Sequence, residues 1–423
     1  MQTTLLLPFK KPAYTTLWFS EGLMNLADQM EFLVLVWLVV ENTESAFLVG
    51  LFSGLRFIGM VLAPVSGTII DRHGGIKALK TTRLIYLFYS GTILTILFFN
   101  KFRLWMPFFM ATLNGINRAS DMVARQTSMA TILGINSINS GVAGFRIVRD
   151  ITQMLGPLLG AIILDSLGIE WSYIAICSVF FISAILVFRV SRQQSSFELA
   201  TVQEESPSKQ LTDSSNTKSS PLWESFKQGL AYVYKSKPLL MLFILATLYN
   251  ILVFPVIYGL MPVIAKSVLN TDATGLGRLM FAIYAGALIG TLIIGSVKSF
   301  KRPGRILTIA NLGWHLAFLA LAPVDIYIWA IIILFIGGFT SGITNVMVEQ
   351  LLLTVSSKEF RGRVMGTRAL AVAALFIGVL GSGSLADATS IQISVATITS
   401  LGFLITIVVT LLLPQLWRIQ TSQ

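Results

Sequence analysis

Four polar side chains recur on one face of an otherwise apolar stretch near the start of the chain. Glu21, Asn25 and Asp28 are spaced by four and three residues, so they share one side of a helix, and Glu31 extends the stripe. A carboxyl group there can take up and release a proton, because a dry cavity favours its neutral form and a nearby cation favours its charged form. The stripe predicts proton chemistry or contact with a polar substrate.

Arg56 is the predicted partner of Asp28. Asp28 lies near the middle of an apolar run at 15–40, and Arg56 lies near the middle of the next run, at 46–70. If the two runs cross a membrane in opposite directions, the two side chains share one depth, where ionisable groups are candidates for function. Two interpretations stay open: coupling of proton movement or substrate contact, or a static ion pair that joins two helices.

The elements that position these residues must be membrane-spanning helices. The chain has 423 residues, of which 54% are hydrophobic and only 12% charged, whereas a soluble domain is about 25% charged. A net charge of +11 does not require nucleic acid, because cations gather in the cytoplasmic loops of membrane proteins. The start of the chain lacks the order of a cleavable signal, so we expect no removed segment. The single cysteine excludes an internal disulfide.

Apolar runs long enough to span a bilayer, about 20 residues each, recur along the whole length. We predict an all-α membrane protein with twelve spans, at 15–40, 46–70, 81–100, 104–124, 139–164, 171–190, 239–265, 274–297, 306–322, 326–352, 364–386 and 392–414. With a cytoplasmic N-terminus, 26 Lys and Arg residues fall in inner segments and 4 in outer ones. This asymmetry predicts a multi-pass protein of the cell inner (plasma) membrane with both termini in the cytoplasm.

The spans fall into two groups of six with a polar segment between them. We expect an N-terminal bundle at 1–190, a cytoplasmic linker at 191–237 and a C-terminal bundle at 238–423. Residues 191–221 are rich in serine and poor in aromatics, which predicts disorder. The rest of the linker carries apolar residues at helical spacing, which predicts a short amphipathic helix on the inner membrane surface.

The two halves of the chain repeat each other. Arg146, Gly156 and Asp165 on the fifth span recur 222 residues later as Arg368, Gly378 and Asp387 on the eleventh. In the same way Gly67 and Lys77, around the turn after the second span, recur 228 residues later as Gly295 and Arg305. Repeated halves are typical of secondary transporters, in which the substrate lies between the repeats near the middle of the membrane.

Three stretches resemble motifs of the major facilitator superfamily. "GTIIDRHGG" resembles the Gly-x-x-x-Asp-Arg-x-Gly signature between the second and third helices, but Gly75 and Ile76 stand where the family has a cation. "GPLLG" is similar to the pattern that exporters carry on the fifth span. "EFRGRVMGTRALA" resembles the Arg-Gly-Arg run of the macrolide-efflux and enterobactin-exporter branch.

This resemblance implies export of a small amphipathic compound, such as a drug, macrolide or siderophore, by proton-coupled alternating access of two six-helix bundles. It also implies a cytoplasmic gate at the end of the second span, where we expect Asp121 to hold Arg72 or Lys77. The arginine that proton antiporters often carry on the fourth span has no match, since Arg118 is expected to lie close to the cytoplasm. The predicted gate residues are Gly67, Asp71, Arg72, Gly74, Lys77, Asp121, Arg361 and Arg363. The resemblance further implies a helix-bend motif at Gly156, Pro157 and Gly160.

Polar and aromatic residues on several spans are candidates for a substrate pocket: Phe32, Tyr249, Asn250, Tyr258, Asn345 and Glu349. We expect lipid, a small molecule and protons as partners of a monomer, with no nucleic acid and no cofactor. The chain has no Gly-x-x-x-x-Gly-Lys-Ser/Thr string for ATP, and two histidines with one cysteine leave little for a metal site or an enzyme. An importer of the same superfamily and a non-transporting receptor are the alternatives.

Overall fold

The computed structural model describes residues 7–99, 101–133, 137–204, 222–297, 300–357, 360, 364 and 371–412, apart from the side chains of residues 64, 68, 71, 139, 194–204, 222–226 and 353. Within these ranges the chain is helical, without a strand. Ten helices are long and apolar enough to cross a membrane. The second span and the polar fourth span bring the number to the twelve that the sequence predicts.

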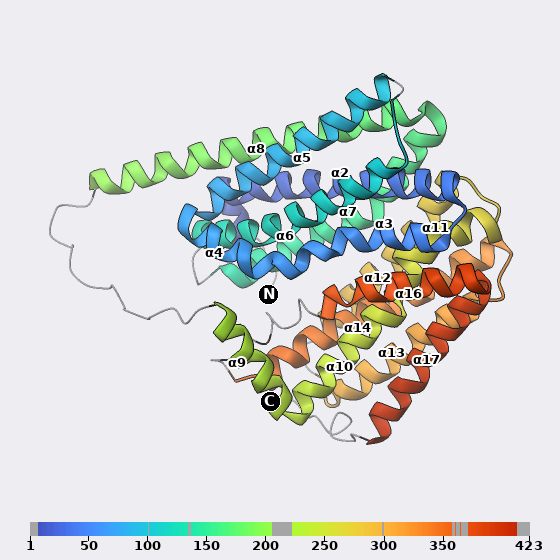
Figure 1. The fold of residues 1–423 in the computed structure, drawn as a ribbon. Helices are drawn as coiled ribbons and strands as arrows, with labels where there is room; N and C mark the ends of the chain where they lie inside the picture. The colour runs from blue at the N-terminus through green and yellow to red at the C-terminus, as the bar shows by residue number, and fades with distance from the viewer. Residues whose placement is uncertain are drawn as a thin grey trace.

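The first six spans form one bundle, which is drawn from blue to green in Figure 1. Its helices are α2 (Pro12–Thr43), α3 (Ala46–Ile58) with η2 (Gly59–Leu62) and α4 (Ala63–His73), α5 (Gly75–Phe98), α6 (Trp105–Leu133), α7 (Ile138–Leu167) and α8 (Ile169–Glu204). The second span is broken at Gly59, where a Cβ atom would lie 2.0 Å from the carbonyl oxygen of Gly115. A side chain at this position would therefore push α3 and α6 apart.

The second bundle, drawn from yellow to red, repeats this layout (Figure 1). Its helices are α10 (Lys237–Leu252), followed by η3 (Val256–Leu260), α11 (Met261–Val263) and η4 (Ile264–Val268), then α12 (Ala273–Ser296), α13 (Pro303–Leu321), α14 (Tyr327–Val355), α16 (Leu375–Ala388) and α17 (Ile391–Leu412). The π-helical turns η3 and η4 follow Pro255 and Pro262, which cannot donate a backbone hydrogen bond.

The segment between the bundles differs in part from the sequence prediction. The stretch 191–221 was expected to be disordered, but α8 continues as a helix to Glu204. The next described element, α9 (Leu222–Lys235), is the expected amphipathic helix. Its Val233 is buried and packs with Leu239 and Leu242 of α10, so α9 rests on the second bundle.

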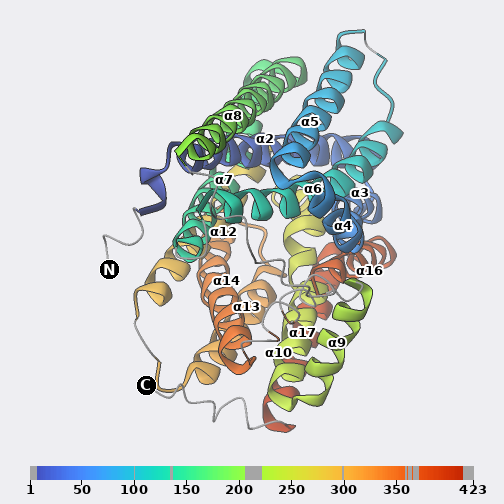
Figure 2. The ribbon, with the colours of Figure 1, turned by 90° about the vertical axis from the view of Figure 1, so that its left-hand side faces the viewer.

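The two bundles approach each other most closely at one end of the molecule. We call this the distal end, and it holds the turns at 44–45 and 269–272; the opposite end, with the turn at Gly74 and α9, is the linker end (Figures 1 and 2). At the distal end Gly383 of α16 packs on α3, and a Cβ atom there would lie 2.6 Å from the carbonyl oxygen of Ala46. Gly277 of α12 packs on α7 in the equivalent place, with Ala161 2.9 Å from where its Cβ atom would lie.

Candidate functional site

The polar stripe of α2 faces the interior of the first bundle. Glu21, Asn25, Asp28 and Glu31 are all buried there. The spacing of four and three residues is responsible, because it keeps the side chains on the face that meets α5 and α6. Three carboxyl groups in a bundle core need compensating cations or hydrogen bonds, and the neighbouring helices supply them in two clusters.

The first cluster surrounds Arg83 of α5, whose side chain is fully buried. One guanidinium nitrogen donates to Glu21 at 2.9 Å and another donates to Asp121 of α6. Arg125, one turn further along α6, also pairs with Glu21. The expectation that Asp121 holds Arg72 or Lys77 is wrong, because Asp121 is buried against α5, where it binds Arg83 and Thr82, while both of those cations are exposed at the linker end.

The second cluster surrounds Asp28. Arg56 of α3 donates to its carboxylate at 2.5 Å, which is the contact that the shared depth predicts. Asn114 of α6 donates at 3.2 Å, and Arg118 of the same helix lies 3.6 Å away. The expectation that Arg118 lies too close to the cytoplasm is wrong, because α6 continues to Leu133 rather than ending at 124. Arg118 therefore lies near the middle of the helix, where it meets Asp28 while remaining 24% exposed.

Glu31 lies beside the Asp28 cluster and is held by neutral groups. Its Oε2 accepts a hydrogen bond from the Tyr89 hydroxyl at 2.8 Å and a longer one from Asn114 at 3.4 Å. Asn114 also donates to the Tyr89 oxygen at 2.7 Å, so the three side chains form a closed triangle. Oε1 of Glu31 has no hydrogen-bond partner within the described part of the chain. A carboxyl group with one unpaired oxygen and no ion pair can hold a proton there.

An aromatic layer covers the Asp28 cluster where the two bundles meet. Arg56 lies over the ring of Phe32 at 4.8 Å, and Arg118 lies 5.7 Å from the ring of Phe57. Both rings contact Tyr258 of the second bundle, with centroid distances of 5.9 Å and 5.3 Å. The rings of Phe32 and Phe57 therefore connect the arginines of the first bundle to Tyr258 of the second bundle.

The remaining pocket candidates lie on the second bundle, and Glu349 among them contacts the first bundle. The Tyr249 hydroxyl donates to Asn345 of α14 at 2.6 Å, and Tyr249 packs on Trp314, with 4.8 Å between the ring centroids. Glu349, one turn beyond Asn345, accepts from Arg146 of α7 at 2.5 Å and so links the bundles. Asn250 is buried and donates to Ala246 of its own helix.

The glycines of the expected helix-bend motif make close helix contacts. A Cβ atom on Gly156 would lie 2.5 Å from Cβ of Gln29, and one on Gly160 would lie 2.9 Å from Cα of Met30. These contacts bring α7 against α2, the helix that carries the acidic stripe. The carbonyl oxygen of Pro157 faces α12, 3.2 Å from where a Cβ atom of Gly277 would lie. The motif thus packs α7 between the two bundles.

The predicted gate is described only in part. Arg361, Arg363 and the side chain of Asp71 lie outside the described residues. Gly74 has φ of 87°, a conformation that side chains disfavour, and this lets α4 turn directly into α5. Gly67 lies near Val123 of α6, at 4.0 Å from its would-be Cβ atom. Among the residues that the structure covers, no group of three or more His, Cys, Asp or Glu could hold a metal ion.

Comparison with known proteins agrees with this architecture. A family model described as Major Facilitator Superfamily matches residues 17–373. The chain belongs to the Major Facilitator Superfamily. It is 23% identical over 377 residues to the enterobactin exporter EntS of Shigella flexneri, covering 88% of this chain and 83% of that one. It is also 23% identical over 337 residues to an uncharacterized MFS-type transporter, YfiS, of Bacillus subtilis (strain 168), covering 78% and 75% of the two chains.

Solved transporter structures share the fold. A POT family transporter in complex with a thioalcohol-conjugated peptide superimposes with a TM-score of 0.74 at 10% identity, covering 95% of this chain and 96% of that one. The nucleoside transporter NupG superimposes with a TM-score of 0.64 at 14% identity, covering 96% and 100%. At such identities the likeness establishes the fold and leaves the substrate open.

The sequence predicted Asp121 as a gate residue and set Arg118 aside, but it did not indicate Asn114, Arg125, Arg83 or Tyr89 as members of the site. Asn114, Arg118, Asp121 and Arg125 recur at intervals of four, three and four residues, so one face of α6 mirrors the stripe of α2. This pattern was available in the sequence. The roles of Arg83 and Tyr89 on α5 were not, because their neighbours follow no such periodicity and only the packing of α5 against α2 and α6 shows their contacts.

Proposed function

We propose that this protein is a secondary active transporter that exports a small amphipathic compound in exchange for protons. It would be a monomer in the cell inner (plasma) membrane, with both termini and the linker end in the cytoplasm, as the distribution of Lys and Arg favours. The observation that carries the proposal is the position of Asp28. Its carboxylate is paired with two arginines that also face the aromatic layer shared by both bundles.

This geometry allows proton binding and substrate binding to exclude each other. A nearby cation favours the charged form of a carboxyl group. Arg118 lies at the boundary of the first bundle and is partly exposed, so a substrate or a movement of the second bundle can draw it away from Asp28. Arg56 then stays in place as the remaining cation beside Asp28. Glu31, with its unpaired oxygen, is the adjacent carboxyl group that can hold a proton.

Two observations support export of an amphipathic compound. Two aligned relatives cover most of the chain, and one of them is named as an exporter of enterobactin. The layer of Phe32, Phe57 and Tyr258 offers ring faces, while Arg118 and the Tyr249–Asn345 pair offer polar groups. A ligand with an apolar body and a few polar groups matches this lining.

The turn at Gly74 is proposed as one side of the cytoplasmic gate. The tight α4–α5 connection presents Arg72 and Lys77 to the solvent at the linker end, where they can meet the second bundle when it closes. Replacing Asp71 by Asn should slow transport in vesicles if the turn acts as a gate, and a wild-type rate would contradict this role.

Transport in everted membrane vesicles tests the proposed function. Everted vesicles that contain the full-length protein are given Hoechst 33342, erythromycin or a catecholate siderophore, with and without the uncoupler CCCP. We expect uptake of at least one compound into everted vesicles, and at least tenfold less uptake with CCCP or with Asp28→Asn. The matched control Asp325→Asn, an exposed residue at the distal end, should transport normally. Uptake that resists both CCCP and Asp28→Asn would overturn the coupling, and uptake only in right-side-out vesicles would show import.

A further inference from the structure

Two aspartates occupy equivalent positions near the distal ends of the two bundles. Asp165 lies near the end of α7, the fifth span of the first bundle, and Asp387 lies near the end of α16, the fifth span of the second. Each carboxylate crosses to the opposite bundle and binds the start of its second span. Asp387 binds α3, and Asp165 binds α12. The 222-residue repeat in the sequence is therefore also a repeat of contacts.

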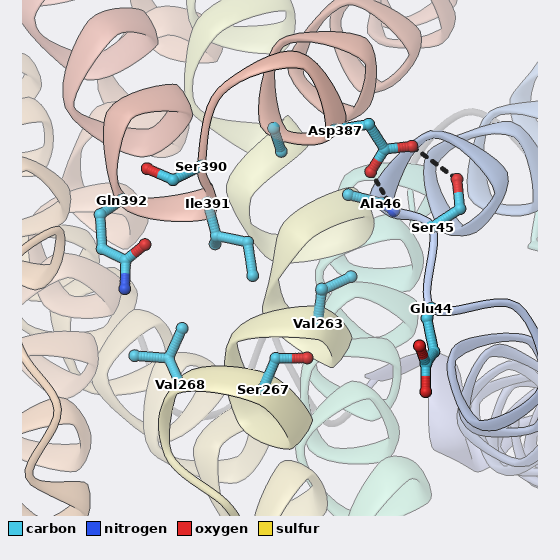
Figure 3. A pocket seen from close by; sticks show the side chains of 11 residues that line it. Glu44, Ser45, Ala46, Val263, Ser267, Val268, Asp387, Ser390, Ile391 and Gln392 are labelled. Carbon is cyan, nitrogen blue, oxygen red and sulfur yellow. Dashed lines mark hydrogen bonds between the residues drawn. The ribbon is translucent and has the colours of Figure 1, made fainter.

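The contact of Asp387 involves both carboxylate oxygens (Figure 3). Oδ1 accepts from the Ala46 amide at 2.7 Å, and Oδ2 accepts from the Ser45 hydroxyl at 2.6 Å and from the Phe47 amide at 3.1 Å. On the other side of the repeat, Oδ2 of Asp165 accepts from the Thr274 amide at 2.5 Å. Both aspartates thus bind backbone amides in the first turn of a helix.

These amides have no partner within their own helix, which explains why a carboxylate binds there. The first four N–H groups of any helix lack an internal acceptor, and the positive end of the helix favours a negative charge. Within each helix the N-cap side chain satisfies a later amide: Ser45 accepts from Leu48, and Asp272 accepts from Gly275. The earlier amides are left for the aspartate of the opposite bundle.

A third contact at the distal end follows the same electrostatic rule with the opposite sign. The ammonium group of Lys266, in η4 of the second bundle, donates to the carbonyl oxygens of Val40 at 3.1 Å and Glu41 at 3.3 Å. These carbonyls belong to the last turn of α2, the negative end of the helix. At the distal end, charged side chains of one bundle therefore bind helix ends of the other bundle. In all three cases the charge is opposite in sign to the helix end that it meets.

We propose that Asp165 and Asp387 are a pair of latches. They hold the distal ends of the two bundles together and must release in each transport cycle. The inference rests on the proposed function, because only alternating access requires this end to open. Both carboxylates are exposed, and Asp387 borders a pocket of about 560 Å³ that Glu44, Ser267 and Gln392 also line (Figure 3). Water can therefore replace the lost bonds, so each latch is weak enough to open.

The latches also explain why a repeat of contacts is useful. α3 and α12 begin at the distal end, and each is held by the helix that packs beside it in the opposite bundle. Releasing one latch alone leaves the other to keep the bundles aligned. Releasing both frees the two bundles to pivot about the aromatic layer deeper in the protein, where Tyr258 contacts Phe32 and Phe57.

Distances between spin labels test the proposal without any substrate. In a Cys177→Ser background, one label pair spans the distal end at Arg103 and Asp325, and a second spans the linker end at Thr131 and Lys301; all four sites are exposed. The full-length protein is placed in nanodiscs of Escherichia coli polar lipid, and distance distributions are measured by double electron–electron resonance.

Neutral variants should shift the population toward an open distal end. We expect Asp165→Asn and Asp387→Asn each to raise the ratio of long to short distal distances by about 3- to 10-fold, and the double variant by about the product, because each removes a charge from a helix end. The linker-end distances should shorten in the same samples. Glu170→Gln and Glu44→Gln, which remove neighbouring carboxylates, should leave both distributions unchanged.

The outcomes separate the latch from the transport function. Unchanged distal distances in the double variant, or an equal shift in the two control variants, would overturn the latch. A shift in the double variant together with a wild-type thermal midpoint would support it, and a lowered midpoint with unchanged distances would show a merely structural role. The vesicle assay reports independently on the proposed function, so a protein that transports nothing can still show the latch, and a transporter can fail to show it.

Discussion

The Arg83 cluster allows a quantitative test of how buried charge stabilises the first bundle. Arg83 is fully buried and pairs with Glu21 and Asp121, two carboxylates that are also buried. Replacing it by Gln leaves both carboxylates without this cation, although Glu21 keeps its contact with Arg125. Removing one partner of a buried ion pair costs about 3–5 kcal/mol, and we expect the lower end of that range because one carboxylate remains paired.

A triple variant distinguishes lost pairing from lost packing. Glu21→Gln, Arg83→Gln and Asp121→Asn together replace these three charges by neutral groups and leave Arg125, whose side chain is 18% exposed, to meet water. Because replacing buried charges together with their partners is often nearly neutral, while removing one member alone is costly, the triple variant should recover more than half of the loss. The control Arg103→Gln, at an exposed site, should change stability by about 0.5 kcal/mol or less.

Thermal midpoints in detergent, measured by fluorescence-detected size-exclusion chromatography, provide the readout. The expected order is wild type and Arg103→Gln highest, then the triple variant, then Arg83→Gln. A midpoint of Arg83→Gln equal to that of the wild type would contradict the reasoning. So would a triple variant less stable than Arg83→Gln, because the penalty would then arise from packing rather than from unpaired charge.

Two further predictions use matched pairs within the first bundle. Gly160→Ala should lower stability by about 1–3 kcal/mol because its Cβ atom would meet Met30 at 2.9 Å. Gly91→Ala should gain up to about 1 kcal/mol from helix propensity, because no atom lies within 4 Å of its Cβ position. Thermal midpoints of the two variants are compared. Tyr89→Phe should cost about 1–3 kcal/mol because it removes the hydroxyl that binds Glu31 and Asn114. Tyr86→Phe removes a buried hydroxyl without a partner among the described residues, and it should be neutral or stabilising by the same measurement.

Much of the fold follows from the sequence because membrane insertion imposes simple rules. Each span must supply an apolar length of helix, and these lengths can be counted along the chain. The contact of Asp28 with Arg56 was also predictable, since both residues sit at the middle of spans that run in opposite directions. These predictions depend only on position along a helix axis.

The ends of a polar helix and its rotation about its axis were harder to predict. The fourth span was expected to end at 124, but α6 continues to Leu133, so Arg118 lies near its middle, where it meets Asp28. Asp121 was expected to bind cations of the nearby turn, but α6 is rotated so that this residue faces α5. An apolar pattern gives neither the end of such a polar helix nor its rotation about its axis.

The contacts inside the first bundle and those between the bundles differ in kind, and the difference suits a protein of two moving bodies. The ion pairs of Arg83 and Arg56 lie within one bundle and are almost completely buried, so breaking them is costly. The pair Arg146–Glu349 joins the bundles and is 27% and 30% exposed, and exposed pairs contribute at most about 1 kcal/mol each. Strong charge pairing therefore makes the first bundle one rigid unit, while the Arg146–Glu349 pair and the exposed Asp165 and Asp387 contacts between the bundles can exchange with water. A conformational change that separates the bundles as bodies, and leaves the Arg83 cluster and the Arg56–Asp28 pair assembled, is the one that this distribution of burial favours.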